Sequence, residues 1–422
     1  MEATRIRLAE GVHLTYLPAR KFKTSLLSAQ FVTPLRRETA GANALLAAVL
    51  RRGTVSCPDM GALSAKMDNL YDASIDYTVR KKGENQCVGF VASFIDDRYA
   101  PDGERLLEPA AALLGELICD PVTYHGRFVP EYFESEKTNL LEAIRSLIND
   151  KRDWADSRLL RALCDGEAYA VPRLGDEETV DKLKALKVYT QYRDLISTAP
   201  LEIIYSGSAD LERVKQALAA AFATLPREEV RVISTAAPHV CRESVQHVED
   251  VLDVTQGKLG MGFSCGSDDM PALLMGNTLF GGSSNSKLFL NVREKLSLCY
   301  YASSLYHRQK GLITVSSGIE FQNYQRAYDE IMAQLEAVQK GELEDWELEG
   351  ARSTLLNSYA TVGDSQGKLE NFYLGQAATG QHETPADLAR AIQDMTAERI
   401  CRAMSTVKLD TVYFLKGKEA EA

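Results

Sequence analysis

The chain has 422 residues, of which 45% are hydrophobic and 25% are charged, and its 48 Lys and Arg residues against 59 Asp and Glu residues give a net charge of −11. One hydrophobic core rarely serves a chain of this length, so we expect two or more domains. The acidic balance argues against broad contact with nucleic acid or with an anionic membrane, because no positive surface offsets the repulsion from phosphate. It leaves room for a basic patch inside a cavity.

The first ten residues lack the apolar core of a secretory signal. No apolar run approaches the roughly 18 residues that a membrane-spanning helix needs. The eight cysteines are scattered, and none forms a Cys-x-x-Cys pair, which argues against zinc-knuckle and thioredoxin-like sites. We therefore expect a cytoplasmic protein with free thiols.

The first half of the chain is expected to alternate between strands and helices. Strands are predicted from period-2 patterns and helices from apolar residues at helical spacing. The expected strands are 11–18, 24–33, 73–80, 86–95 and a segment from Leu201, and the expected helices are 41–52, 59–70, 103–119, 129–148, 153–164, 177–196 and 210–225.

The second half repeats this order. Lys81-Lys-Gly83 between two strands is echoed by Gln309-Lys-Gly311, and the strand at Leu201 is echoed by the strand at Leu409. The expected strands are 258–265, 301–308, 312–319 and 409–415, and the expected helices are 270–280, 286–296, 323–339 and 346–356. A period of roughly 210–230 residues indicates two similar α+β domains rather than a solenoid.

The boundary between the two domains is expected in a charged segment that is flanked by prolines and poor in large apolar residues. We assign 1–225 to the first domain, 226–240 to the linker and 241–422 to the second domain.

The spacing of the histidines argues against a zinc site on one helix. No two of the six histidines have the i, i+4 spacing that places two imidazoles on one helix face for zinc. His239 and His247 flank the linker and a strand, where a metal role is not expected. The sequence also lacks Gly-x-Gly-x-x-Gly, Walker and Gly-x-Ser-x-Gly motifs, so neither nucleotide binding nor serine hydrolase chemistry has support.

One stretch has a chemical pattern of its own. The glycines and serines of 281–286 precede a helical pattern, and a strand-like segment then begins near Tyr300. Arg293 and Tyr300 are seven residues apart, so they can meet only if the chain bends between them. Together they could hold a polarised carbonyl. On this stretch alone we favour the plainer interpretation, in which the arginine forms a surface salt bridge and the tyrosine fills the core.

The stretch and the repeat together resemble the pitrilysin/insulinase (M16) peptidase family. Residues 280–289 and Arg293-Glu-Lys-Leu-Ser-Leu-Cys-Tyr300 are similar to the family's Gly-rich turn, Ser-(Lys/Arg)-Leu-Phe and Arg-Glu-Lys-x-Gly-Leu-Ala-Tyr. Ser297 stands where the family usually has Gly, and Cys299 where it has Ala. The resemblance implies an α+β fold with two homologous LuxS/MPP-like domains that form half of a clamshell.

Active members of this family carry a zinc-binding helix, His-x-x-Glu-His, that leads into Met-Leu-Phe-x-Gly-Thr. When the segment is anchored on Thr54, the two histidine positions fall on Ala44 and Ala48 and the base position falls on Ala47. Alanine can neither ligate zinc nor accept a proton. The resemblance therefore implies a degenerate zinc site.

The third ligand of active members is a glutamate on a later helix. Its position falls on Ala143, with Glu142 one residue away, so this part of the alignment stays open. We expect no metal, no other cofactor and no peptide hydrolysis by this chain alone.

In the family, the arginine and tyrosine of the second-domain motif reach the substrate at the zinc site of the other half. The resemblance thus implies that Arg293 and Tyr300 bind substrate in trans. The expected partner is an active zinc-bearing M16 homologue, or a second copy of this chain when it is isolated, with a peptide or protein in the shared chamber. Among zinc-less members, the chain most resembles bacterial proteins associated with 5-aminopentanol modification of elongation factor P.

Two other functions stay open. One is a binding or scaffold protein of the same fold with no proteolysis in its assembly, like the zinc-less members of respiratory complexes. The other is a zinc peptidase with unrelated ligands, which the histidine spacing disfavours.

Overall fold

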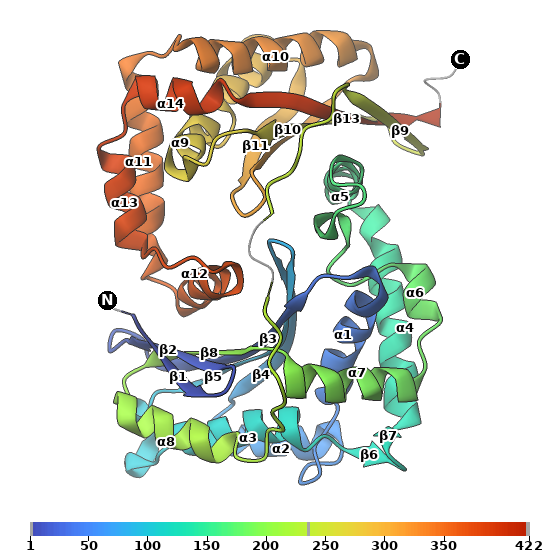
Figure 1. The fold of residues 1–422 in the computed structure, drawn as a ribbon, viewed down its shortest axis with the longest axis vertical. Coiled ribbons are helices and arrows are strands. Elements are labelled where there is room, and N and C mark those ends of the chain that lie inside the picture. Colours follow the sequence, from blue (N-terminus) through green and yellow to red (C-terminus); the bar gives the residue numbers. More distant parts are fainter. Residues whose placement is uncertain (1–2, 234–236, 419–422) are drawn as a thin grey trace. The chain divides into compact units, whose positions relative to one another are not determined.

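The computed structural model describes residues 3–233 and 237–418. The chain forms two compact units (Figure 1). Unit 1 comprises residues 1–145, 171–235 and 363–382, and unit 2 comprises the remaining three segments, 146–170, 236–362 and 383–422.

Unit 1 is built on a six-stranded mixed sheet with the strand order β1-β2-β8-β3-β5-β4. β2 pairs with β8 in parallel, and the other neighbours are antiparallel. The strands are β1 (Thr4–Ala9), β2 (Val12–Pro18), β3 (Thr24–Pro34), β4 (Ser74–Lys82), β5 (Asn85–Ile95) and β8 (Leu201–Gly207), with a separate short hairpin of β6 (Thr123–Tyr124) and β7 (Arg127–Phe128).

The helices of unit 1 pack on this sheet because its strands present apolar side chains at alternate positions. Leu27, Ala29 and Phe31 of β3 point into the hydrophobic core, whereas Ser28 and Gln30 point to the opposite face. The helices are α1 (Arg37–Leu50), α2 (Met60–Asp68), α3 (Leu107–Cys119), α4 (Pro130–Ser146), α6 (Glu177–Asp181), α7 (Ala185–Thr198), α8 (Leu211–Ala221) and α12 (Gln366–Thr379).

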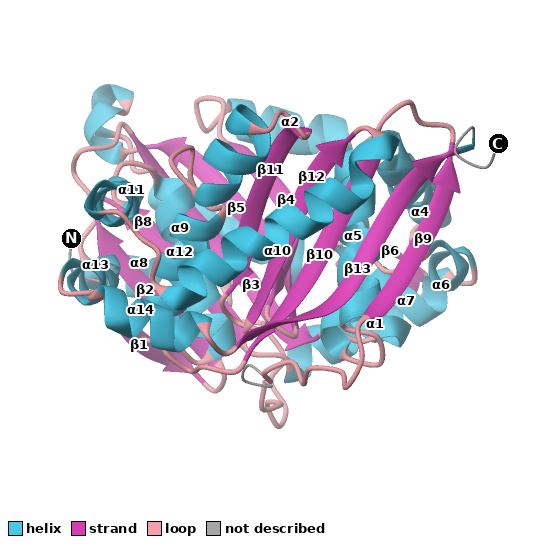
Figure 2. Ribbon diagram, turned by 90° about the horizontal axis from the view of Figure 1, so that it is seen from above, coloured by secondary structure: helices cyan, strands magenta, loops and turns pink. Residues whose placement is uncertain are grey.

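Unit 2 has a five-stranded sheet with the order β11-β12-β10-β13-β9, in which only β13 and β9 pair in parallel. Its strands are β9 (Gln246–Leu252), β10 (Gly257–Cys265), β11 (Cys299–His307), β12 (Leu312–Ile319) and β13 (Val407–Gly417). Its helices are α5 (Lys151–Leu163), α9 (Met270–Phe280), the π-helix η5 (Leu288–Lys295), α10 (Tyr324–Lys340), α11 (Asp345–Val362), α13 (Pro385–Gln393) and α14 (Ala397–Met404). Figure 2 shows α10 crossing the strands of this sheet.

The two sheets have the same connectivity once β1 is set aside. In chain order, the five strands of each unit occupy the first, third, last, fourth and second positions across the sheet. The repeat inferred from the sequence is therefore a repeat of topology. Within the described residues, no helix has both the length and the apolar composition needed to cross a bilayer.

One pair of equivalent helices is exchanged between the units. α5, from the first half of the sequence, packs against β10 and β13, and α12, from the second half, packs against β8 and β3. Gly260 and Gly262 of β10 make room for α5, since a Cβ at Gly262 would lie 2.7 Å from Leu163. The expected contiguous domains, 1–225 and 241–422, differ from the compact units by these exchanged segments, because helix periodicity does not show which sheet a helix will cover.

The expected linker is partly anchored on unit 1. Arg227 donates hydrogen bonds to the carbonyls of Ile196 and Ala199, and Arg231 pairs with Asp194. Residues 234–236 of the linker lie outside the described residues.

Candidate functional site

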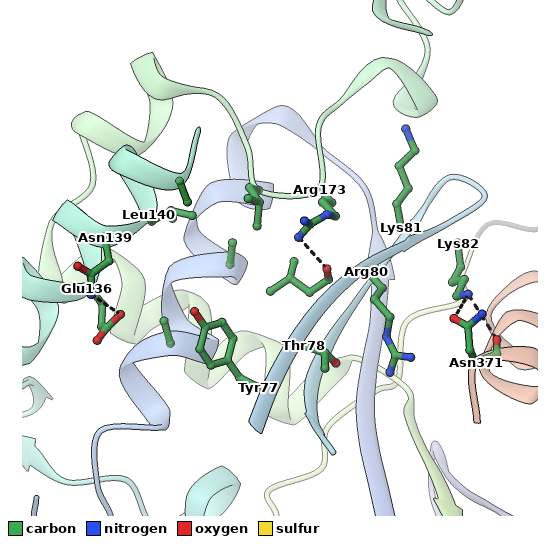
Figure 3. Close-up of a pocket in the computed structure, with 15 residues that line it drawn as sticks. Tyr77, Thr78, Arg80, Lys81, Lys82, Glu136, Asn139, Leu140, Arg173 and Asn371 are labelled. Atoms are coloured by element: carbon green, nitrogen blue, oxygen red, sulfur yellow. Dashed lines mark hydrogen bonds between the residues drawn. The ribbon is translucent and has the colours of Figure 1, made fainter. Parts of the chain in front are cut away.

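Three of the four positions assigned to a degenerate zinc site border one cavity in unit 1. Ala44 and Ala48 are one turn apart on α1, and Ala143 comes from α4. All three line a cavity of about 810 Å³ (Figure 3). Glu142 does not line it, so the geometry favours Ala143 as the third position.

Ala47, at the expected base position, has a different environment. It is 1% exposed and packs in the hydrophobic core of unit 1 rather than lining the cavity. Ala44 belongs to the same core cluster, and the i, i+3, i+4 spacing places Ala44, Ala47 and Ala48 on one face of α1.

The residues that line the cavity do not fit a zinc ion. Glu136 is its one carboxylate, and this group is occupied, since Arg52 Nε lies 2.9 Å from Glu136 Oε1 and Asn139 donates to Oε2. None of the lining residues is a histidine or a cysteine. Zinc requires several nitrogen, sulfur or carboxylate ligands, and methyl groups stand at the positions to which the family resemblance assigns them.

The rest of the cavity wall is rich in positive charge. Four cationic side chains line it: Arg80, Lys81, Lys82 and Arg173. Arg80 forms a bidentate pair with Glu370 of α12, with both N–O distances at 2.6 Å. The Lys82 ammonium donates to the side-chain oxygen of Asn371.

Within the described residues, no carboxylate forms an ion pair with Arg173. Its Nη1 donates to the Val79 carbonyl at 3.2 Å (Figure 3). Tyr77 stands beside it on β4, and partial burial raises the pKa of this phenol. Tyr77 is therefore neutral at pH 7 and can donate a hydrogen bond.

These cations are the functional candidates that sequence reasoning did not find. Lys81 and Lys82 were expected in a turn, but β4 extends through Lys82, and the turn consists of Gly83, at φ 59°, and Glu84. The run of three cations at 80–82 was the available signal. A run of charge usually marks a solvated face, and only the fold places this one at a cavity.

Arg293 lies on the π-helix η5 in unit 2. The sequence of this stretch predicted a helix followed by a strand, and β11 follows η5. The Arg293 side chain is 40% exposed, its guanidinium lies 4.6 Å from the centre of the Phe289 ring, and Nη1 lies 3.5 Å from Glu294. An exposed contact of this length contributes little energy, so the guanidinium can exchange it for another acceptor.

Tyr300 lies on β11 and is 64% exposed, so it does not fill the core as the plainer interpretation supposed. Its hydroxyl donates to Glu320 at 3.0 Å. This hydrogen bond to a carboxylate raises the pKa of Tyr300. None of the described contacts joins Arg293 to Tyr300. Each side chain contacts other groups and faces solvent.

The chain does bend between the two. The amide of Leu298 donates back to the carbonyl of Val292, and Ser297 between η5 and β11 has a φ of 49°. This left-handed conformation suits glycine. It explains why glycine is usual at this position of the motif.

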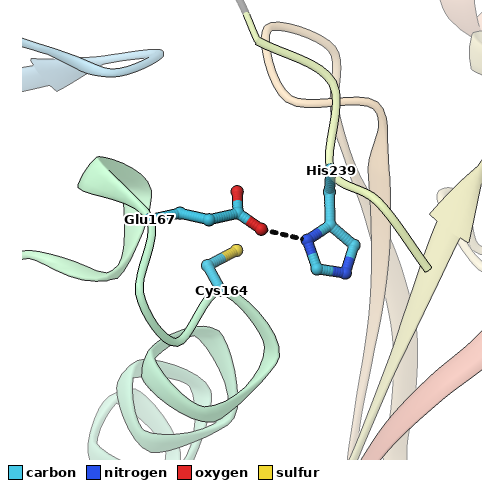
Figure 4. Close-up of side chains that lie close together, drawn as sticks. All are labelled: Cys164, Glu167 and His239. Carbon is cyan, nitrogen blue, oxygen red and sulfur yellow. Dashed lines mark hydrogen bonds and ion pairs between the residues drawn. The ribbon is translucent and has the colours of Figure 1, made fainter. Parts of the chain in front are cut away.

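A third group of polar side chains lies in unit 2. Cys164, Glu167 and His239 bring one possible metal-ligating atom each within 4.8 Å of one another (Figure 4). It is the one such group among residues 3–233 and 237–418. Both ring nitrogens of His239 are already engaged, Nδ1 by Glu167 and Nε2 by Asp410.

Ion pairs account for this group better than a metal does. Lys310 pairs with Glu167, and Arg242 pairs with Asp410 at 2.6 Å. Burial alone would raise the pKa of Asp410, but its hydrogen bonds from Arg242, Thr411 and His239 together lower it. A buried ammonium beside the carboxylate would repel a divalent cation, so we assign the cluster to anchoring residues 239–242 on unit 2.

Comparison with known proteins agrees with this picture. A family model described as Peptidase M16 inactive domain matches residues 182–355. The chain is 34% identical over 416 residues to the probable inactive metalloprotease YmfF of Bacillus subtilis, covering 97% of this chain and 96% of that protein.

Solved structures show the same fold. A conserved protein from Enterococcus faecalis V583 superposes with a TM-score of 0.89 at 27% identity, covering 99% of both chains. A peptidase M16 inactive domain from Pseudomonas fluorescens superposes with a TM-score of 0.80 at 18% identity, covering 99% of this chain and 98% of that one. The chain belongs to the M16 peptidase family and is similar to inactive members of it.

Proposed function

We propose that this chain is the supporting subunit of a two-chain M16 peptidase. It associates with a zinc-bearing M16 homologue in the cytoplasm and contributes Arg293 and Tyr300 to the partner's substrate site. The observation that carries the proposal is a contrast within one chain: unit 1 has alanines at Ala44, Ala48 and Ala143, whereas unit 2 has a partly exposed Arg293 and an exposed Tyr300.

The chemistry of the pair suits this role. A guanidinium and a neutral phenol both donate hydrogen bonds, and both can stabilise the negative charge that develops on the oxygen of a scissile amide. Tyr300 keeps its proton at neutral pH, since the hydrogen bond to Glu320 raises the phenol's pKa above its ordinary value. Arg293 lies on a π-helix, an element that often occurs at functional sites.

The test mixes the purified chain with a zinc-bearing M16 homologue from the same cell and measures cleavage of a quenched fluorescent peptide. We expect the mixture to exceed the sum of the separate chains. Arg293→Ala should then lower kcat on the order of 10²-fold, the usual effect of removing an oxyanion donor. Tyr300→Phe should lower it as well, because only the donating hydroxyl is lost.

Lys295→Ala is the matched control, since Lys295 is an exposed cation on the same π-helix. It should leave the activity of the mixture unchanged. If the chains associate without any gain in cleavage, the chain is a binding or scaffold subunit; if they do not associate, the pairing is wrong.

The cellular process is part of the proposal. The zinc-less proteins that the chain resembles are associated with 5-aminopentanol modification of elongation factor P, and we place the pair in that process. Deleting this chain should then change the mass of elongation factor P, as intact-protein mass spectrometry would show. An unchanged mass would remove this process from the proposal and leave the pairing in place.

A further inference from the structure

We propose that the cavity of unit 1, where the zinc positions have become alanines, binds an acidic peptide segment. The inference rests on the proposed function only in taking a peptide as the ligand class. Binding itself requires no partner chain, because every lining residue belongs to unit 1.

The size and floor of the cavity suit a peptide side chain. A volume of about 810 Å³ lies within the usual range for ligand sites. Ala44, Ala48, Leu140 and Ala143 supply an apolar floor, and Val79 of β4 adds to it. An aliphatic or aromatic side chain could be buried there, and methyl groups in place of metal ligands leave the space for it.

The positive charge of the cavity wall favours a ligand with negative charge. Four cationic side chains and one carboxylate line the cavity, in a chain whose net charge is −11. Arg52 neutralises Glu136 and Glu370 neutralises Arg80, whereas no carboxylate of the described residues pairs with Arg173, so the wall keeps a positive charge. A concave site with walls of one sign concentrates ligands of the opposite sign.

The position of the cations favours an extended ligand over a small anion. Arg80, Lys81 and Lys82 follow one another along β4, and Figure 3 shows Lys81 and Arg173 on one side of that strand and Arg80 on the other. β4 is the last strand of its sheet, so one row of its backbone groups faces away from β5. Carboxylates spaced along an extended chain could meet Arg173 and Lys81 together on their side of the strand, whereas one phosphate would meet only part of this charge.

Arg173 and Arg80 differ in what they offer. Glu370 already engages both terminal nitrogens of Arg80, whereas Arg173 is exposed and donates only to the Val79 carbonyl. We therefore assign recognition of a ligand carboxylate to Arg173, with Lys81 on the same side of the strand.

The experiment measures fluorescence anisotropy of labelled peptides with the purified chain alone. Three short peptides of equal length alternate Leu with Glu, Gln or Lys. We expect the Glu peptide to bind at least about tenfold more tightly than the Gln peptide, which is the effect of roughly 1.4 kcal/mol. The preference should shrink as salt is added, because exposed charges are screened.

Variants locate the site. Arg173→Glu should weaken binding of the Glu peptide about tenfold or more, because repulsion between carboxylates replaces attraction to the guanidinium. Ala48→Trp should weaken binding of the Glu and Gln peptides alike, because the larger side chain fills the apolar floor of the cavity. Circular dichroism and Tm check that this variant is folded. Lys182→Glu is the matched control: Lys182 is an exposed cation of unit 1 outside the cavity, and the same change of charge there should leave binding unchanged.

Equal binding of the three peptides would overturn the proposal, as would an equal loss in Lys182→Glu and Arg173→Glu. Inorganic phosphate that binds the cavity while no peptide does would also overturn it, in favour of a small-anion site. The peptide-binding experiment contains no partner chain. A negative result would therefore overturn only the peptide site, and the activity of the two-chain mixture would still test the proposed function.

Discussion

At Ser297 the backbone takes a left-handed conformation that a serine adopts at a cost. The residue lies between Arg293 and Tyr300, and the bend it makes separates the π-helix from β11. The side chain is exposed, so packing does not compensate the strain. The position therefore offers a direct measure of how strongly the local backbone constrains this motif.

Ser297→Gly should raise the free energy of unfolding by about 0.5 kcal/mol, because relief of strain outweighs the greater freedom of glycine in the unfolded chain. Ser297→Val should lower it by more than about 1 kcal/mol, since a β-branched side chain fits φ 49° poorly. Urea unfolding monitored by circular dichroism measures both. A fall in stability with glycine would show that the serine makes a compensating contact.

At the scale of elements, the exchange of α5 and α12 decides how the units are built. α12 lies on the polar face of the unit 1 sheet, where Ser28 donates to Glu370 at 2.7 Å and Arg80 pairs with the same carboxylate. Glu370 is almost fully buried, with 4% of its side chain exposed. A buried carboxylate that has both partners holds the helix in register, whereas one that has lost a partner is costly.

Glu370→Gln should destabilise the protein by about 2–3 kcal/mol, because the Arg80 guanidinium loses its counter-charge in a buried setting. Hydrogen exchange in α12 should rise more than exchange in α5. Asp364→Asn is the matched control, since Asp364 pairs with Lys21 in an exposed contact near the same helix, and its effect should stay under about 0.5 kcal/mol. Equal effects of the two variants would contradict the docking role of Glu370.

At the scale of the whole molecule, the proposed function divides one chemistry between the two units. In that proposal, unit 1 has the position of a zinc site without its ligands, and unit 2 supplies two donors that would act on a substrate. The Cys164, Glu167 and His239 group is held by Lys310 and Asp410 rather than left open to a metal. Zinc should therefore play no part in the stability of this chain.

Purified chain should contain well under one equivalent of zinc by elemental analysis, and a chelator should not change its Tm. Added zinc should not raise Tm either, since a ligand stabilises only the state that binds it. A zinc-bearing M16 homologue, as the control, should lose stability with the same chelator. A chelator-sensitive Tm in this chain would show that the group around His239 binds metal.

Much of the fold followed from local pattern. Most of the strands and helices, the repeat and the turn at Gly83 follow from periodicity and turn residues, which depend on neighbours in sequence. The ends of elements were less well predicted. The helix expected at 177–196 is two helices, α6 and α7. Helices α12, α13 and α14 were not assigned, nor were the edge strands β1 and β9, although burial alternates along both strands.

The sequence by itself determined the family, because a motif is a matter of residue identity. The loss of zinc ligands at the alanine positions and the substrate role of Arg293 and Tyr300 stay predictions from the same motif. The tertiary structure alone decided three other matters: that α5 and α12 are exchanged, that Ala44, Ala48 and Ala143 border one cavity, and that cations of β4 and Arg173 line its wall. These depend on contacts between residues far apart in the chain. Periodicity shows which face of an element is apolar, but only packing shows what that face meets.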